Sequence, residues 1–403
     1  MTRPLFIKAL SVPRPVAGLS VLAVGAAAAA ALAAVDGGFG QRAWPLVAGL
    51  VFGVALQRGE LSLVRAWRDL LMLRDSGQLL GFLSALAVAA VLTLGCLALL
   101  GASGPPVNAR IGHVGWLLPI SAFVFGVGSV VARGGVMVHL RRLGEGSLVA
   151  VPALLATFAG FVAGIAMWPW AYRTAIAPAA SPWLPEWVGL AGALGLQIAA
   201  LAACAAALWR FRPRRGPDPR PMSIRVLVEP WPASVAGGLL GALVAASYAA
   251  GQPLGLIAEC ATVARWLATA VGWAPAAMPE LDAGIGGIVV PLPDGFGLTE
   301  HVVIVAGFVV GAFACALASG RFTLALFTAR DMAEMIVGGL MLGWGAMTSL
   351  GAVTGEAIAG VAIGAASGWV FLLFASLGVV AALKLDRRAA VTHPGPDLVG
   401  PEG

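Results

Sequence analysis

The sequence predicts an all-α protein that crosses a membrane many times. Of its 403 residues, 60% are hydrophobic and 11% are charged, and the mean hydropathy is +0.92. Soluble domains carry about 25% charged residues. About 20 consecutive apolar residues suffice to span a bilayer, and from the apolar lengths we expect roughly nine or ten spans with about four short broken or re-entrant helices. The composition excludes an ordinary soluble domain.

The second observation is a helix that stops and then resumes. The apolar run 51–56 ends in Gln-Arg-Gly-Glu at 57–60, and a short helical pattern continues to Asp75. Inside a bilayer such a break is tolerated only where the freed backbone groups face protein or a water-filled cavity. The break therefore predicts part of a solute path.

The third observation is that this break recurs. Val-Phe-Gly-Val at 51–54 is repeated at 124–127, and the second helix runs into Arg-Gly-Gly at 133–135. In the second half, a helix over 338–350 runs into Gly-Ala-Val-Thr-Gly-Glu at 351–356. We interpret these repeats as two pseudo-symmetric halves built from one kind of broken unit.

Taken in order, the first half begins with a retained span over 16–35. This apolar run is longer than the core of a signal peptide, and the basic residues before it place the N-terminus in the cytoplasm. The first broken unit ends in a full span over 79–100, and a turn rich in Gly, Pro and Asn follows at 102–112. The second unit leads into a span over 147–168. Aromatic residues around 168–187 are typical of an interfacial belt.

A polar linker over 209–232 separates the N-terminal half, residues 1–208, from the C-terminal half, residues 233–386. It follows a span over 187–208 and is rich in arginine and proline, so the positive-inside rule places it in the cytoplasm. Its arginines either set only the orientation of the chain or also bind anionic lipid. Because the formal net charge of +6 comes largely from such segments, we expect no nucleic-acid partner.

The second half repeats the pattern of the first. Beside the third broken unit, we expect a helix over 234–250, a break at 251–255 and a Gly/Pro-rich loop over 273–298. We also expect two spans, over 302–318 and 369–383. Lys384 and the arginines after it place the C-terminus inside, before a tail over 387–403. Two cytoplasmic ends require an even number of spans.

The cysteines and histidines indicate no metal or catalytic site. Four of each are scattered along the chain, with no pair at metal-ligand spacing and no H-E-x-x-H or Walker-type loop. A nucleophile–base pair is also missing from the sequence pattern. We therefore predict a protein without metal or cofactor that is not an enzyme.

At its breaks the chain resembles the YeeE/YedE sulfur-transport family, the inner-membrane permeases associated with thiosulfate uptake. The residues that carry the resemblance are Phe-Gly at 52–53 with Arg58 through Arg68-Asp69, Phe-Gly at 125–126 with Arg-Leu-Gly-Glu-Gly at 142–146, and, in the last unit, Gly338, Gly339, Gly343, Gly345, Gly351, Gly355 and Ser-Gly-Trp at 367–369. The resemblance covers most of the chain. It implies a multi-pass protein of the bacterial inner membrane that moves a small sulfur anion.

The family's pattern places a cysteine in three of the breaks, where thiols are thought to contact the soft sulfur of thiosulfate in turn. This chain has Ser62, Gly135 and Ala352 at those positions. The change removes polarizable S–H groups and leaves hydroxyl and backbone donors. We therefore expect either a shift towards a more oxygen-rich anion or weakened transport.

The physics of the breaks defines the candidate pathway residues. A helix that begins inside the membrane directs unsatisfied N–H groups and the positive end of its dipole at the cavity, and such an end attracts anions. The candidates are Arg58, Ser62, Arg133, Gly134, Gly135, Gly351, Ala352, Thr354, Gly355 and Glu356.

Several of these candidates have two open interpretations. Arg58 and Arg133 either serve the pathway or snorkel to the membrane edge. Ser62 either donates to an oxyanion or bonds its own backbone. Glu356 fits a counter-ion or proton carrier, and it equally fits a structural carboxylate held by a partner.

Two functions fit this pattern. The leading hypothesis is a permease that moves a small sulfur-containing anion past the three breaks. The alternative is a membrane scaffold that has kept the fold and lost transport, working with a cytoplasmic sulfur-carrier protein. Loss of the three cysteines favours the scaffold, whereas retention of Arg58 and Arg133 favours the permease.

Overall fold

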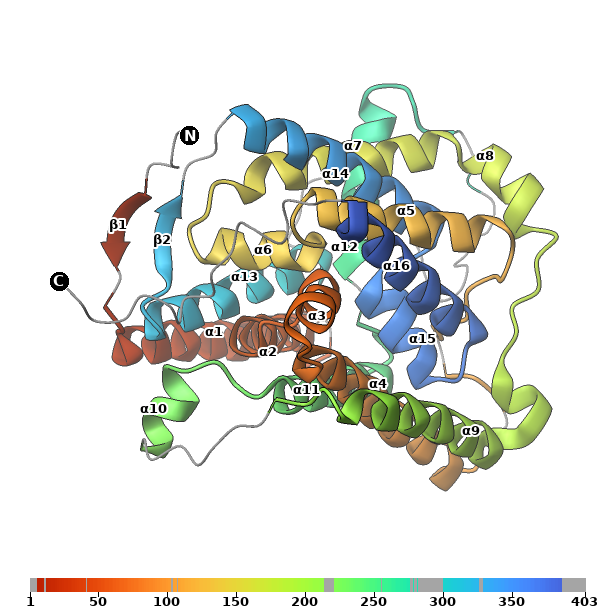
Figure 1. The fold of residues 1–403 in the computed structure, drawn as a ribbon, viewed down its shortest axis with the longest axis horizontal. Coiled ribbons are helices and arrows are strands. Elements are labelled where there is room, and N and C mark those ends of the chain that lie inside the picture. Colours follow the sequence, from red (N-terminus) through yellow and green to blue (C-terminus); the bar gives the residue numbers. More distant parts are fainter. Residues whose placement is uncertain are drawn as a thin grey trace.

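A computed structural model confirms the predicted all-α membrane architecture (Figure 1). It describes residues 6–10, 12–40, 42–102, 104–106, 108–213, 221–254, 256–275, 278, 281, 300–325 and 329–385. The tail 387–403, most of the loop 273–298 and residues 214–220 of the linker lie outside the described residues.

The described residues contain seven segments long and apolar enough to cross a membrane. A further pair of helices passes the same test but is bent by 53°, and two shorter apolar helices accompany them. Adding the two shorter helices gives nine and adding the bent pair gives ten, which are the predicted nine or ten spans. Each of the three predicted breaks interrupts one of the seven segments, rather than separating two spans.

The elements of the first half follow the predicted order of spans and breaks. They are α1 (Pro15–Val35), α2 (Ala43–Gly59), α3 (Leu63–Arg68), the π-helical turn η1 (Asp69–Leu73), α4 (Gly77–Leu99), α5 (Leu117–Val131), α6 (Val136–Gly144), α7 (Ala150–Ala166), α8 (Trp168–Ala171), η2 (Tyr172–Ile176) and α9 (Leu184–Trp209).

The second half and the linker supply the remaining elements. They are α10 (Met222–Leu227), α11 (Ala233–Ala249), α12 (Leu256–Ala270), α13 (Glu300–Ala318), α14 (Ala329–Thr348), η3 (Val353–Ile358), α15 (Ala359–Ala362) and α16 (Ala366–Leu385). The sequence did not predict the antiparallel ribbon that β1 (Phe6–Leu10) forms with β2 (Phe322–Ala325).

The molecule has two ends. The ribbon and α10 gather at the left of Figure 1, and we name this the linker end. Here the Ser76 amide donates to the Phe211 carbonyl over 3.0 Å. Residues 104–116, η2 and the start of α9 form the far end, where the Val114 amide donates to the Ala180 carbonyl over 2.8 Å. By the positive-inside rule we expect the linker end to face the cytoplasm.

The tightest helix packing joins the two halves and relates them by pseudo-symmetry. α2 packs along α13, α4 along α11, α5 along α16 and α7 along α14. In chain order, α2, α4, α5 and α7 of the first half correspond to α11, α13, α14 and α16 of the second. Under this correspondence the α2–α13 contact becomes the α11–α4 contact, and the α5–α16 contact becomes the α14–α7 contact. A two-fold relation between the halves produces this pattern.

Glycines let these paired helices approach to backbone contact. A Cβ at Gly343 of α14 would lie 1.9 Å from the Thr157 carbonyl oxygen of α7. A Cβ at Gly53 of α2 would lie 2.1 Å from the Phe308 carbonyl oxygen of α13. Small residues at such crossings are the usual means by which membrane helices pack, because lipid offers no hydrophobic drive between them.

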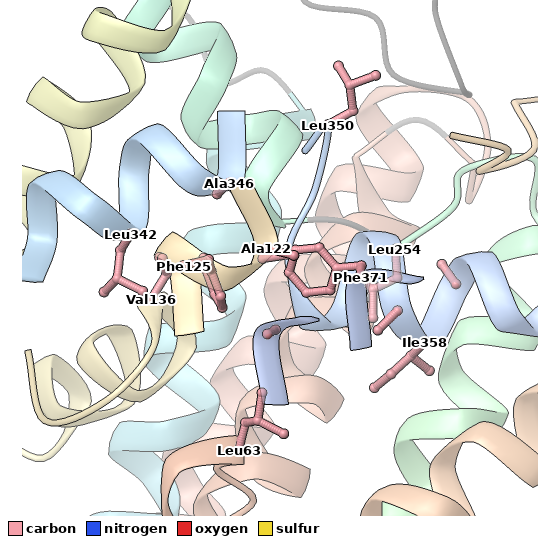
Figure 2. Packing of buried hydrophobic residues seen from close by; sticks show 14 of the residues in the cluster. Leu63, Ala122, Phe125, Val136, Leu254, Leu342, Ala346, Leu350, Ile358 and Phe371 are labelled. Atoms are coloured by element: carbon pink, nitrogen blue, oxygen red, sulfur yellow. The ribbon is translucent and has the colours of Figure 1, made fainter. Parts of the chain in front are cut away.

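The broken ends of these helices share one buried core. The rings of Phe125 in α5 and Phe371 in α16 are buried, with centroids 5.6 Å apart. Figure 2 shows Leu63, Leu254 and Ile358 near this pair, so residues that follow different breaks meet in the same cluster. The core therefore fixes the breaks relative to one another.

Candidate functional site

Each of the three predicted breaks begins with a residue in the same left-handed backbone conformation. Glu60, Arg133 and Leu350 end their helices in the left-handed region, with φ of 50°, 57° and 57°. This conformation costs a residue with a side chain about 1–2 kcal/mol, and glycine usually takes it. The chain thus leaves the helix sharply and starts a new helical segment within a few residues.

The three positions at which the resemblance leads us to expect cysteine are N-caps of those new segments. Ser62, Gly135 and Ala352 have extended backbone and precede α3, α6 and η3. The Ser62 hydroxyl accepts a long bond of 3.4 Å from the Arg65 amide, whereas Gly135 and Ala352 offer no side-chain cap. Because the first amides of a helix have no acceptor within it, each N-cap leaves free N–H donors.

The three N-caps line one cavity of about 60 Å³. Its hydroxyl groups come from Ser62, Ser129 and Thr354. The rest of the lining is largely apolar and comprises Leu56, Leu61, Leu63, Val64, Phe82, Phe125, Gly135, Val136, Met137, Val138, Leu240, Ala352, Val353 and Ile358. A single water requires about 10–15 Å³, so this cavity can hold one small multi-atom anion.

The lining, as far as the structure describes it, includes none of the four cysteines. Cys96 and Cys204 are exposed on α4 and α9, and Cys260 and Cys315 are buried in α12 and α13. An anion in the cavity would therefore meet hydroxyl oxygens and backbone N–H groups. These donors suit oxygen atoms better than they suit a soft sulfur atom.

The other predicted residues lie near the cavity without lining it. The Arg58 guanidinium donates to the Val226 carbonyl and lies 5.9 Å from the ring centroid of Trp231. Arg133 has a side chain that is 47% exposed and pairs with Asp331 at 2.9 Å and with Glu334. The other predicted residues that do not line the cavity are Gly134, Gly351, Gly355 and Glu356.

Comparison with known proteins identifies the family. A family model described as "Sulphur transport" matches residues 58–381. The chain belongs to the Sulphur transport family. A relative named thiosulfate transporter TsuA, from Spirochaeta thermophila, is 27% identical over 344 residues, which are 83% of this chain and 95% of that protein. The resemblance found at the breaks is thereby confirmed, and the protein is a multi-pass membrane permease.

At the linker end of the molecule, this Sulphur transport family member has its charged side chains paired. Glu60, in the first break, accepts hydrogen bonds from both Arg65 and Arg321. Glu145, just after α6, accepts one from Gln57 at 2.7 Å and one from Arg141 at 2.8 Å. The Glu145 network ties the first broken unit to the second, and the Glu60 network ties the first broken unit to Arg321 after α13.

At the far end, the charges are buried and incompletely paired. Glu356 is 2% exposed and Arg110 is 5% exposed. The Glu356 Oε1 atom and the Arg110 Nε atom have no hydrogen-bond partner. Burial lowers the pKa of the Arg110 guanidinium from its ordinary value, although an arginine keeps its charge in proteins.

Hydrogen bonds to the backbone hold the two segments that carry these charges. The Arg110 amide donates to the Tyr248 hydroxyl over 3.3 Å, and that hydroxyl donates to the Ala359 carbonyl over 2.9 Å. The Gly112 amide donates to the Ser367 hydroxyl oxygen over 3.1 Å. Arg110 was not predicted from the sequence, because a lone arginine in a turn carries no local signal.

Proposed function

We propose that this family member carries a small sulfur-containing anion across the bacterial inner membrane through the cavity at the three breaks. The observation that carries the proposal is that Ser62, Gly135 and Ala352, which are far apart in sequence, are N-caps that line one cavity. Because a helix N-terminus carries partial positive charge, three of them around one cavity give an electropositive site without a cation in its described lining. The name of the thiosulfate-transporting relative supports a sulfur anion.

The chemistry of the lining supports an oxygen-rich solute. Ser62 and Thr354 offer O–H donors, and the N-caps offer N–H donors. The Ser129 hydroxyl already donates to the Gly126 carbonyl over 2.7 Å. Sulfite and sulfate present oxygen to all of these donors, whereas thiosulfate also presents a soft terminal sulfur. We therefore propose that the cavity prefers sulfite or sulfate over thiosulfate.

The remaining candidates have supporting roles in this proposal. Arg58 and Arg133 position two of the breaks, since Arg58 donates to the Val226 carbonyl and Arg133 pairs with Asp331 and Glu334. Gly134 keeps the second break tight, since its φ of 157° is unusual for a residue with a side chain. Gly351 keeps the third break tight by close packing, because a Cβ there would lie 2.9 Å from the Glu356 Cβ, and Gly355 lies in the η3 turn that follows. The anion passes unchanged, so the protein is a carrier and not an enzyme.

The test is uptake of labelled thiosulfate, sulfite and sulfate into vesicles that hold the purified protein. Gly135→Val is the informative variant, because a Cβ there meets only the Phe125 ring, at 3.9 Å, and the larger side chain would fill the cavity. We expect uptake to fall at least ~10-fold, equivalent to about 1.4 kcal/mol, with unchanged thermal stability. Gly95→Val is the matched control, since a Cβ at Gly95 meets nothing within 4 Å.

Two results would contradict the permease proposal. One is the absence of flux for all three anions with wild-type protein. The other is an uptake rate in Gly135→Val equal to that of Gly95→Val, which would place the pathway elsewhere.

A non-transporting scaffold that works with a cytoplasmic sulfur-carrier protein is the second candidate. The observation that favours it is the cysteine-free lining of the cavity. In a scaffold, Arg58→Ala and Arg133→Ala would change neither anion flux nor growth on sulfur compounds. In a permease, both substitutions lower the rate of uptake.

A further inference from the structure

The turn η3 carries a second polar region that the cavity does not use. Val353 and Thr354 line the cavity, whereas Glu356 lies beside Gly112 and Ser367. A Cβ on Gly112 would lie 2.5 Å from Glu356 Oε1, so the carboxylate packs directly against the backbone of this segment. The turn η3 thus lines the cavity through Val353 and Thr354 and also carries the buried carboxylate of Glu356.

Arg110 is the described cation that acts on this carboxylate. Both side chains are at least nine-tenths buried, and each has a polar atom without a hydrogen-bond partner. The chain segments that carry them are in contact, since a Cβ on Gly360, one turn after Glu356, would lie 3.5 Å from the Arg110 carbonyl oxygen. Their opposite charges attract each other electrostatically. A buried, half-satisfied arginine is costly in a membrane protein unless it serves a ligand or a functional partner.

Among the described residues packed around η3, no cation other than Arg110 pairs with Glu356. The titratable groups on the segment and helices packed around η3 are His113, Tyr248, Cys260 and Arg265, with Cys96 and Lys384 farther along α4 and α16. Glu259 of α12 also belongs to this set, and its side chain lies outside the described part of the chain. Arg265 and His113 have interactions of their own.

We propose that Arg110 and Glu356 form a coupling site at which the transported anion and one proton bind together. The inference rests on the proposed function. A buried guanidinium can balance one negative charge, so an anion that reaches Arg110 competes with the Glu356 carboxylate. Protonation of Glu356 removes this competition.

The charges balance through the cycle. Without anion, Arg110 and the Glu356 carboxylate sum to zero. With a monovalent anion, one proton moves from external water to a Glu356 oxygen, and Arg110, the anion and the neutral carboxyl again sum to zero. A divalent anion carries one net negative charge through the same step.

The test uses full-length protein in vesicles with the membrane potential clamped at zero. With the exterior acidic by one pH unit, one proton per anion drives up to ~10-fold accumulation of the labelled sulfite, sulfate or thiosulfate that is transported. In Glu356→Gln the side chain resembles the protonated carboxyl. We expect anion exchange to persist, and both the accumulation and the anion-dependent acidification of the vesicle interior to be lost.

Glu186→Gln is the matched control, because Glu186 is an exposed carboxylate at the same end of the molecule. It should accumulate anion as the wild type does. If Glu356→Gln does not fold, Glu356→Asp keeps a carboxyl group one methylene farther away and must shift the pH at which uptake is half-maximal. An unshifted profile in Glu356→Asp overturns the coupling site.

Other outcomes separate this inference from the permease proposal. Wild-type flux that a pH gradient cannot drive overturns the coupling site alone. Proton-driven accumulation that persists in Glu356→Gln does the same. No flux for any of the three anions overturns the proposed function and the coupling site with it.

Discussion

The two ends of the molecule treat charge in opposite ways. At the linker end, Glu60 is paired with Arg65 and Arg321, whose side chains are 40% and 33% exposed. At the far end, Glu356 and Arg110 are buried, and each keeps an unpaired atom. Partly exposed pairs contribute little energy and mainly hold geometry. Buried, half-paired charges are costly, so the far end is where we place the coupling of anion and proton.

The largest effect should come from Arg110→Gln, which leaves the Glu356 carboxylate buried without its cation. Removing one partner of a buried charge pair costs about 3–5 kcal/mol. We expect a marked fall in thermal stability in detergent together with the loss of proton-coupled uptake.

The double variant Arg110→Gln with Glu356→Gln sharpens the result. It should recover most of the stability, because neither charge remains, while coupled uptake stays absent. An equal loss of stability in the single and double variants would show that the two residues do not interact and would remove the contrast between the ends.

An intermediate effect is expected from restoring thiols at the three N-caps. The triple variant Ser62→Cys, Gly135→Cys and Ala352→Cys puts polarizable sulfur back into the cavity lining. Because a few matched contacts in a site discriminate by roughly tenfold, we expect the ratio of thiosulfate to sulfate uptake to rise by about that factor. Gly95→Cys, outside the cavity, is the control, and an unchanged ratio in the triple variant would separate the N-caps from solute selection.

The smallest effect should come from Glu60→Gln at the linker end. The variant loses the charge of the carboxylate that Arg65 and Arg321 share, and partly exposed pairs of this kind contribute about 0.2–1 kcal/mol. The loss of thermal stability should shrink further at high salt, because exposed charges are screened. If Glu60→Gln loses as much thermal stability as Arg110→Gln, the charges at the linker end matter as much for stability as those at the far end, and the contrast between the ends is wrong.

Much of the fold could be predicted because its signals are local. The expected span 16–35 corresponds to α1 (Pro15–Val35), and the span 187–208 lies within α9 (Leu184–Trp209). The breaks were visible because glycine and charged residues interrupt apolar runs over a few positions. The β1–β2 ribbon was missed because its strands come from distant parts of the chain, and its register depends on their meeting.

Hydropathy and helix interruption alone determined that this chain is a membrane bundle with breaks at Ser62, Gly135 and Ala352, since both properties depend on neighbouring residues. Only the tertiary structure decided that these N-caps share a cavity, that Arg58 is directed to Val226, and that Arg110 lies near Glu356. The physical reason is that a side chain's direction and its charge partner depend on which helices pack together, and no local pattern records that packing.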